Sequence, residues 1–126
     1  MSDPVFLTLH QVKALHRMAL DRHGGRDGIR DAATLESAVM HPCNVWLYGQ
    51  GDLFDIASAY AFHLAQAQAF LDGNKRTGLA AALVFLEVNG VSVPEATDEL
   101  YPAMIAIAER RLDKPGMAAL LRRVSG

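Results

Sequence analysis

Two long apolar stretches dominate the middle of the chain. Over residues 53–70 and 77–89, apolar side chains occur on nearly every face of a helix. A helix that is apolar all round is buried at the centre of a protein. Asp52 is a suitable N-cap for the first of these helices, and Asn89-Gly90 is a typical end for the second. The pattern therefore predicts two buried helices that the rest of the chain covers.

The N-terminal pattern predicts a helix that begins at Thr8. Thr8 and Gln11 have the spacing of a capping box, in which each side chain satisfies a backbone amide of the other residue. Gly24-Gly25 is expected to end the helix, because glycine adopts the backbone conformations found just past helix C-termini. A stripe of apolar residues at helical spacing is expected to face the core: Leu9, Val12, Leu15, Met18 and Ala19.

A second helix is predicted over residues 31–40. Asp31 or Thr34 can cap it, and His41-Pro42 is expected to stop it, since the residue before a proline is disfavoured in a helix. The apolar and aromatic residues 45–48 fit either a short helix or a packed loop, and the pattern leaves both open.

Two further helices are predicted near the C-terminus, over residues 97–112 and 117–124. Lys114-Pro115-Gly116 is expected to break the chain between them. No segment has a strand pattern long enough for a sheet. The sequence therefore predicts an all-α fold, a single compact domain over residues 1–126 with about six helices around the central buried pair.

Composition narrows the class of protein. The net charge of −2 over 126 residues gives no signature of nucleic-acid binding. The single cysteine, Cys43, cannot form an intrachain disulfide, which fits a reducing compartment, and its surroundings in the sequence favour an inert thiol. No leader peptide is recognisable at the N-terminus, and no apolar stretch is long enough to span a bilayer. We expect a cytoplasmic protein with no membrane partner and no direct contact with nucleic acid.

The histidines do not form a recognisable metal site. His10, His16 and His23 are six and seven residues apart, which is not the i, i+4 spacing of a zinc-binding helix. We expect ordinary surface side chains at these three positions. His63, in the middle of the first buried helix, is expected to be a partly buried histidine with its hydrogen bonds satisfied rather than a catalytic one.

Residues 24–31 are expected to form a loop, because three glycines and four charges in eight residues do not suit a core. Two interpretations stay open. The segment is either a solvated connection or a recognition loop against which an extended partner segment pairs.

The most unusual stretch lies between the two buried helices, at residues 68–77. Lys75 and Arg76 stand where the second helix begins, although a helix N-terminus carries partial positive charge and favours acidic residues. A bound anion resolves this conflict, because free backbone amides, the helix dipole and both cations would act on one ligand. Gly73 permits close backbone approach, and Asp72 is a candidate ligand for a magnesium ion that bridges phosphate oxygens. The alternative is a tight turn in which Arg76 makes a structural salt bridge.

This stretch is similar to a known motif. Phe70-Leu71-Asp72-Gly73-Asn74-Lys75-Arg76-Thr77 resembles the core of the Fic/Doc family motif in its Doc (death-on-curing) form, whereas Fic proteins proper have glycine at the position of Lys75. Residues 28–31 with 35–38, and residues 60–63, also resemble parts of Doc-like proteins. The similarity therefore extends over most of the chain.

The resemblance implies a Fic fold and transfer of a group from ATP, with magnesium, to a hydroxyl of a protein. Fic members usually transfer AMP, whereas Doc-type toxins transfer phosphate to a threonine of elongation factor Tu and so arrest translation. By position, Asp72 would bind the metal or orient the catalytic group, and Phe70 would pack beneath the loop. The phosphates would be bound by four consecutive residues: Gly73, Asn74, Lys75 and Arg76.

The resemblance also implies a partner protein. Toxins of this family are paired with a small antitoxin whose C-terminal segment covers the site, and residues 24–31 would correspond to the region that presents the target. The chain has no [ST]xxxE[GN] stretch of the kind that self-inhibited Fic proteins carry. This agrees with control by a separate partner.

One position departs from the family motif. The motif begins with a histidine two residues before the phenylalanine, and Gln68 stands there in this chain. That histidine takes the proton of the attacking hydroxyl, and glutamine has no basic nitrogen for this role. The catalytic position is thus expected to be impaired, either in a deliberately inactivated toxin or in a natural variant. Three functions stay open: an impaired phosphate-transferring toxin, an AMP transferase, and a non-catalytic variant that binds nucleotide or antitoxin.

Overall fold

The computed structural model describes residues 3–49, 51–93 and 97–125, and these form helices without a β-strand. The helices are α1 (Leu9–His23), α2 (Ala32–Leu47), α3 (Leu53–Ala67), α4 (Asn74–Val88), α5 (Thr97–Ala108) and α6 (Lys114–Val124). The expected all-α class with about six helices is confirmed. No helix in these ranges has both the length and the apolar character that a membrane crossing requires.

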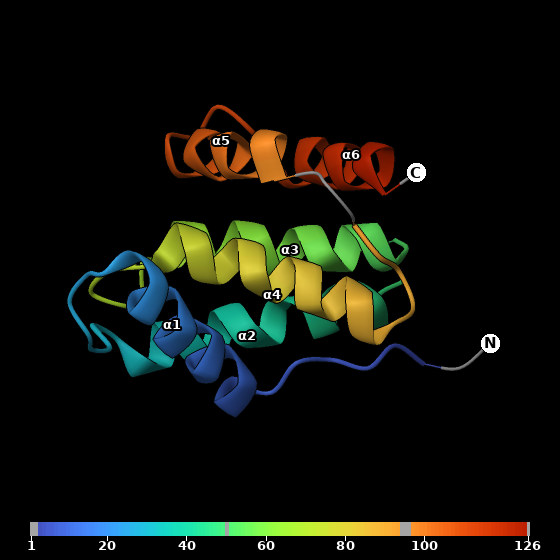
Figure 1. The fold of residues 1–126 in the computed structure, drawn as a ribbon. Helices are drawn as coiled ribbons and strands as arrows, with labels where there is room; N and C mark the ends of the chain where they lie inside the picture. Colours follow the sequence, from blue (N-terminus) through green and yellow to red (C-terminus); the bar gives the residue numbers. More distant parts are fainter. Residues whose placement is uncertain (1–2, 50, 94–96, 126) are drawn as a thin grey trace.

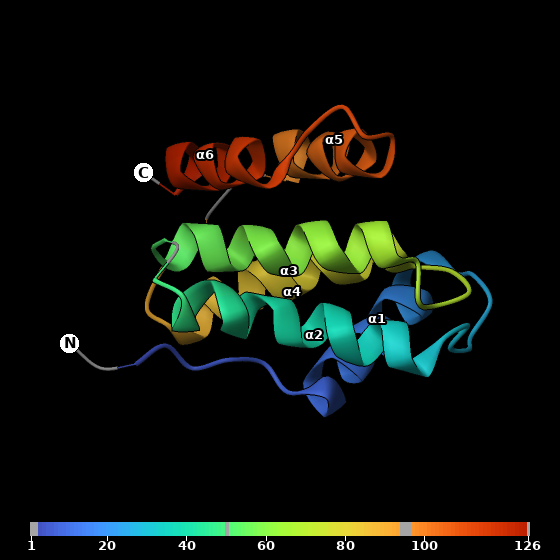
Figure 2. The same ribbon diagram turned by 180° about the vertical axis from the view of Figure 1, so that it is seen from behind.

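The helices lie in three layers, with α3 and α4 in the middle one (Figure 1). Helices α1 and α2 cover one side of this pair, and α5 and α6 cover the other, as the view from behind also shows (Figure 2). Along α3, the residues from Ile56 to Ala61 are all buried, on every face of the helix. The predicted central pair of buried helices is therefore confirmed.

Small residues let α3 and α4 approach closely. A Cβ added at Gly78 of α4 would lie 2.9 Å from the backbone oxygen of Ala61 in α3 and 3.1 Å from the terminal methyl of Met104 in α5. A backbone oxygen cannot rotate away as the end of a side chain can. At Gly78, α3, α4 and α5 are so close that the position has room for a hydrogen atom but not for a side chain.

The predicted helix caps are present. Thr8 and Gln11 form the reciprocal capping box of α1, and Gly24 follows its last turn. Asp31 caps α2 by accepting a hydrogen bond from the Thr34 amide, so the first of the two proposed caps is the one used. These ends are set by short-range chemistry, which explains why the sequence predicts them.

The predicted stop at His41-Pro42 is wrong. Helix α2 continues through Pro42 to Leu47, so most of residues 45–48 form its last turn. Pro42 removes one amide donor, but it is itself buried, and Val45 and Trp46 beyond it pack against the core. Burial of these apolar side chains outweighs the lost hydrogen bond.

Several other helix ends differ from the prediction. Helix α3 ends at Ala67, so Phe70 lies in the connection after it and not in the helix. Helix α4 begins at Asn74, three residues early, and α5 ends at Ala108, four residues early. Helix α6 begins at Lys114, where a chain break was expected. Asp113 caps it by accepting a hydrogen bond from the Gly116 amide. Pro115 lies in its first turn, where backbone amides make no bond within the helix, so the missing amide of proline costs nothing there.

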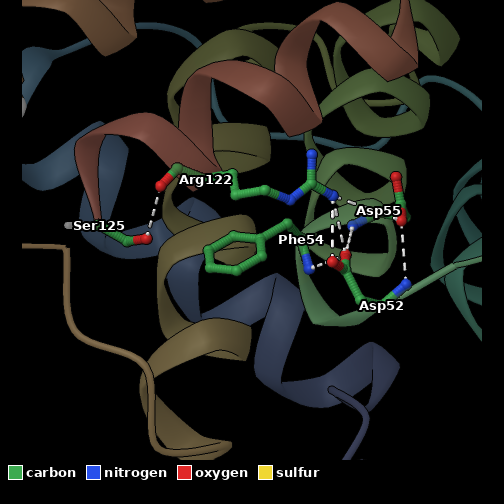
Figure 3. Close-up of polar contacts among 5 residues, drawn as sticks. All are labelled: Asp52, Phe54, Asp55, Arg122 and Ser125. Atoms are coloured by element: carbon green, nitrogen blue, oxygen red, sulfur yellow. Dashed lines mark hydrogen bonds and ion pairs between the residues drawn. The ribbon is translucent and has the colours of Figure 1, made fainter.

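Arg122 joins α6 to the N-terminus of α3 (Figure 3). Its guanidinium lies 3.1 Å from both carboxylate oxygens of Asp52 and 3.7 Å from Asp55, and it sits over the ring of Phe54. Exposed ion pairs of this kind contribute about 1 kcal/mol or less each. The contact fixes the end of the bundle opposite to the α3–α4 connection, and it gives this arginine a structural role.

We predict that Gly78→Ala destabilises the protein by about 1–3 kcal/mol, because the new methyl group overpacks the α3–α4 contact. Helix propensity alone gives the opposite sign, a gain of about 1 kcal/mol. Urea unfolding measures the difference. Ala119→Gly at an exposed position of α6 calibrates the propensity effect, and a more stable Gly78→Ala protein would contradict the close contact.

Candidate functional site

The connection between α3 and α4 reverses the chain in six residues, 68–73. Both of its ends have left-handed backbone conformations: Gln68 has φ 48° and ψ 43°, and Gly73 has φ 83° and ψ 13°. Glycine adopts this conformation freely, whereas glutamine does so at a cost on the order of 1 kcal/mol. The backbone is therefore strained at Gln68, the position of the expected catalytic residue, and its side chain is exposed.

Asn74 holds this connection in shape. Its side-chain oxygen accepts a hydrogen bond from the Phe70 amide at 3.1 Å, and its side-chain nitrogen donates to the Phe70 carbonyl at 3.0 Å. Both polar atoms of the Asn74 side chain are thus used inside the loop. The backbone amide of Asn74, at the first position of α4, has no acceptor among the described residues and is free for a ligand.

The loop of residues 24–31 is paired with the connection. The Arg30 amide donates to the Ala69 carbonyl at 2.6 Å, and the Leu71 amide donates to the Gly28 carbonyl at 3.0 Å. Between them lies an antiparallel bridge of Ile29 with Phe70. The extended segment that this loop pairs with is thus part of the chain's own motif, and loop and motif form one unit.

Asp72 points its carboxylate toward this loop. One carboxylate oxygen accepts a hydrogen bond from the Arg26 amide at 2.6 Å and one from the Arg26 side chain at 3.3 Å. The Arg26 amide is the main reason why the pKa of Asp72 lies below its ordinary value, and the Arg26 guanidinium adds to the effect. Asp72 is therefore ionised at neutral pH, and its side chain is 41% exposed.

Asp72 fits a magnesium ion that is bound mainly by the phosphates of a substrate. Among the described residues, no cluster of three or more His, Cys, Asp or Glu exists that could hold a metal by itself. Magnesium commonly uses one or two carboxylates together with the phosphates of a substrate. The second carboxylate oxygen of Asp72 accepts no hydrogen bond within the described ranges, so it is available for such an ion.

The prediction that His16 lies at the surface is wrong. His16 is 4% exposed, with its ring stacked on Phe70 and its Nε2 atom 2.8 Å from the Asp72 carbonyl oxygen. His10 and His23 are exposed, as expected. The signal in the sequence was the spacing of four from Val12 to His16 and from His16 to Leu20, which places all three on one helix face.

The Arg76 side chain makes its contacts with other helices. Its guanidinium lies 3.1 Å from His23 Nε2 and 4.2 Å from the centre of the Tyr101 ring, so it connects α4 with α1 and α5. The adjacent cation Lys75 is half-buried and forms no ion pair with any residue that the structure describes. Neither His23 nor Tyr101 was predicted to belong to this site.

The start of α4 has the features of an anion site. Gly73 caps the helix without a side-chain hydrogen bond. The amides of Asn74, Lys75 and Arg76 have no acceptor among the described residues, because the first backbone bond of the helix runs from Thr77 to Gly73. Free amides, the helix dipole and the unpaired Lys75 together favour a negatively charged ligand.

His63 lies elsewhere and is not an alternative base for this site. Its ring stacks on His41 of α2 at 3.9 Å, and its Nε2 atom accepts a hydrogen bond from Lys114 of α6 at 3.1 Å. Burial, then His41 and then Lys114 lower the pKa of His63 to about 4. The predicted partly buried histidine is confirmed, with a hydrogen bond at its Nε2 atom.

The chain is similar to known proteins over most of its length. The sequence model of the Fic/DOC family matches residues 6–86. The chain is 33% identical over 114 residues to a protein named Protein kinase doc, from Escherichia phage P1, and the match covers 90% of each chain. It is 38% identical over 103 residues to Toxin Doc of Mycolicibacterium smegmatis, with 78% of each chain covered.

We predict that acid weakens the fold through His63. Since the folded-state pKa of His63 is about 4 and its ordinary value is 6.5, its stabilising neutral state is fully present above pH 6.5. The free energy of unfolding should fall as the pH is lowered from 6.5 toward 4. His63→Gln should reduce the difference between pH 7 and pH 5 in urea unfolding, and an unchanged difference would contradict burial of a neutral His63 as the source of the effect.

Proposed function

Because the chain belongs to the Fic/DOC family, we propose that it is a Doc-type toxin that binds ATP at the start of α4. In its active form, such a toxin would transfer phosphate from ATP to a hydroxyl of a translation factor similar to elongation factor Tu. The names of the two relatives, a protein kinase and a toxin, support this assignment. The observation that carries it is the set of unbonded backbone amides at the start of α4, which lies beside Asp72 and the unpaired Lys75.

Residues 72–76 supply the binding chemistry in this proposal. The backbone amides of the first turn of α4 and the ammonium of Lys75 would hold the phosphates, and Asp72 would hold magnesium with its free carboxylate oxygen. Bound magnesium would neutralise part of the phosphate charge. Asn74 would act through its backbone, since its side chain is bonded to Phe70.

Gln68 sets the limit on catalysis. In phosphate transfer, the bond from the γ-phosphorus to the bridging oxygen breaks, and a new bond forms from phosphorus to the substrate oxygen. The hydroxyl proton must pass to a base. Gln68 can donate and accept hydrogen bonds but has no basic nitrogen, and loss of a general base lowers a rate by about a hundred- to ten-thousand-fold. We therefore propose binding with little transfer for this chain.

Transfer of phosphate is favoured over transfer of AMP by Lys75. Lys75 is the second residue of α4, so its half-buried side chain occupies space beside the anion site that glycine would leave open. This should crowd the triphosphate arrangement that suits Fic proteins proper, in which glycine stands at this position.

A groove between α1 and α4 is the proposed docking surface for an antitoxin. Its volume is about 420 Å³, and it is lined by apolar residues of both helices, among them Leu15, Met18, Leu79 and Leu83. Met18 was expected to face the core, and this prediction is wrong, because its side chain is 53% exposed at the groove. Arg22, His23 and Arg76 line it too, so an amphipathic segment with an acidic end is the occupant that fits. Since Arg76 also follows directly on Lys75, such a partner would reach the edge of the anion site.

We predict that Gln68→His restores growth arrest on expression and ATP-dependent labelling of a target protein. Label from γ-phosphate-labelled ATP should appear in the target, and label from α-phosphate-labelled ATP should not. The gain should be about a hundredfold or more, because the histidine supplies the missing base.

Two controls accompany this experiment. Gln68→Asn changes the side chain without adding a base and should stay inactive. Gln68→His with Lys75→Ala should lose most of the restored labelling. An inactive Gln68→His protein that still binds ATP would point to a non-catalytic binding module, and label from the α-phosphate would point to an AMP transferase.

We predict that Met18→Lys weakens binding of the proposed antitoxin partner at least tenfold, because it places a charge in the apolar groove. Met40→Lys is the matched control, since Met40 lies on α2 outside the groove and is 56% exposed against 53% for Met18. Calorimetry with the purified pair measures both. Equal affinities for the two variants would rule out this groove as the docking surface.

A further inference from the structure

His16 is the most deeply buried histidine among the residues that the structure describes. It lies in the middle of α1, on the face that also carries Val12 and Leu20, and it is 4% exposed. A polar ring at this depth needs a hydrogen-bond partner. The partner it has belongs to the motif, although the two lie 56 residues apart in sequence.

His16 touches three residues of the connection between α3 and α4. Its ring lies parallel to that of Phe70, with the ring centres 3.7 Å apart and 7° between the planes. Its Nε2 atom is 2.8 Å from the carbonyl oxygen of Asp72. A Cβ added at Gly73 would lie 3.3 Å from His16 Cδ2 and 3.5 Å from Nε2, so the ring also fills the space beside Gly73.

The hydrogen bond from His16 has a defined direction. A carbonyl oxygen only accepts, so Nε2 must carry the proton and donate it. The peptide between Asp72 and Gly73 is planar and trans, and its amide therefore points opposite to its carbonyl. By drawing the carbonyl toward α1, His16 turns the Gly73 amide away from α1.

This orientation adds a donor to the anion site. Within residues 3–49, 51–93 and 97–125, no group accepts a hydrogen bond from the Gly73 amide. Gly73 is left-handed and the next residue is helical, which is the backbone combination that gathers successive amides around an anion. The Gly73 amide and the free amides of the first turn of α4 are then consecutive donors.

We infer that His16 is a positioning residue for the phosphate site: it sets the Asp72–Gly73 peptide so that the Gly73 amide can bind phosphate. This inference rests on the proposed ATP binding at the start of α4. His16 does not touch the reacting atoms, and its effect passes through one peptide group.

The test uses binding, so it needs no catalytic activity. His16→Phe keeps a flat ring on Phe70 and removes the donor, whereas His16→Gln places an amide nitrogen close to the position of Nε2. Calorimetry with ATP and magnesium should show about tenfold weaker binding or more for His16→Phe, as expected for loss of one hydrogen bond to a charged group. His16→Gln should bind within about threefold of the unsubstituted chain.

Urea unfolding of each variant and an NMR spectrum of the backbone amides accompany the affinity measurements. If His16→Phe folds and binds ATP as the unsubstituted chain does, the inference is overturned. If His16→Phe does not fold, the NMR signal of the Gly73 amide proton in the unsubstituted chain is the test. A large downfield shift of this signal on addition of ATP supports the inference, and an unmoved signal overturns it. A His16→Gln protein that folds but binds as weakly as His16→Phe also overturns it, because the donor then does not matter.

Failure of the proposed function is distinguishable from failure of this inference. Lys75→Ala serves as the reference, since it removes a cation from the site without touching His16. If the unsubstituted chain does not bind ATP, or if Lys75→Ala leaves the affinity unchanged, the ATP site itself is wrong. If Lys75→Ala weakens binding and His16→Phe does not, only the role of His16 is wrong.

Discussion

The close approach of α3 and α4 is the constraint on which the site depends. Neighbouring helices that run in opposite directions leave few residues to reverse the chain, and here residues 68–73 do so with left-handed conformations at both ends. The turn is then held from three sides, by the Asn74 side chain, by the loop of residues 24–31 and by His16. These contacts hold the backbone of the turn in place while the first amides of α4 stay without an acceptor among the described residues.

The sequence predicts features that depend on neighbours in the chain. Thr8 and Asp52 are followed at the correct spacing by their capping partners, and the two central helices are apolar on most faces. The unusual chemistry of residues 72–76 is also visible in the sequence, and its assignment to phosphate binding stays a prediction. In each case the deciding interaction lies within about four residues, so one stretch contains the information.

Features that depend on distant packing were not predicted. Pro42 reads as a helix stop, and only the core beneath Val45 and Trp46 shows why α2 continues. His16 reads as a polar residue, because its partner Asp72 is distant in sequence. The pattern also could not show that Arg76 turns toward His23 and Tyr101, since both lie on other helices.

Gln68 bears on catalysis but not on the proposed binding of the ligand. The anion site depends on backbone amides and Lys75, and none of these requires a basic side chain at position 68. The left-handed conformation of Gln68 is set by the turn, so a histidine at this position would inherit the same backbone geometry. In the proposed function, a single substitution at this position would change reactivity while the backbone of the proposed anion site stays the same.

The position of Arg76 has a thermodynamic consequence. Its guanidinium lies against His23 and Tyr101 on the wall of the α1–α4 groove, while its backbone amide belongs to the free first turn of α4. A ligand at the helix start that attracts this guanidinium would withdraw it from the groove, and an occupant of the groove that pairs with it would withhold it from the helix start. The two binding equilibria would then be linked through one side chain, and each ligand would change the affinity of the other by the same factor.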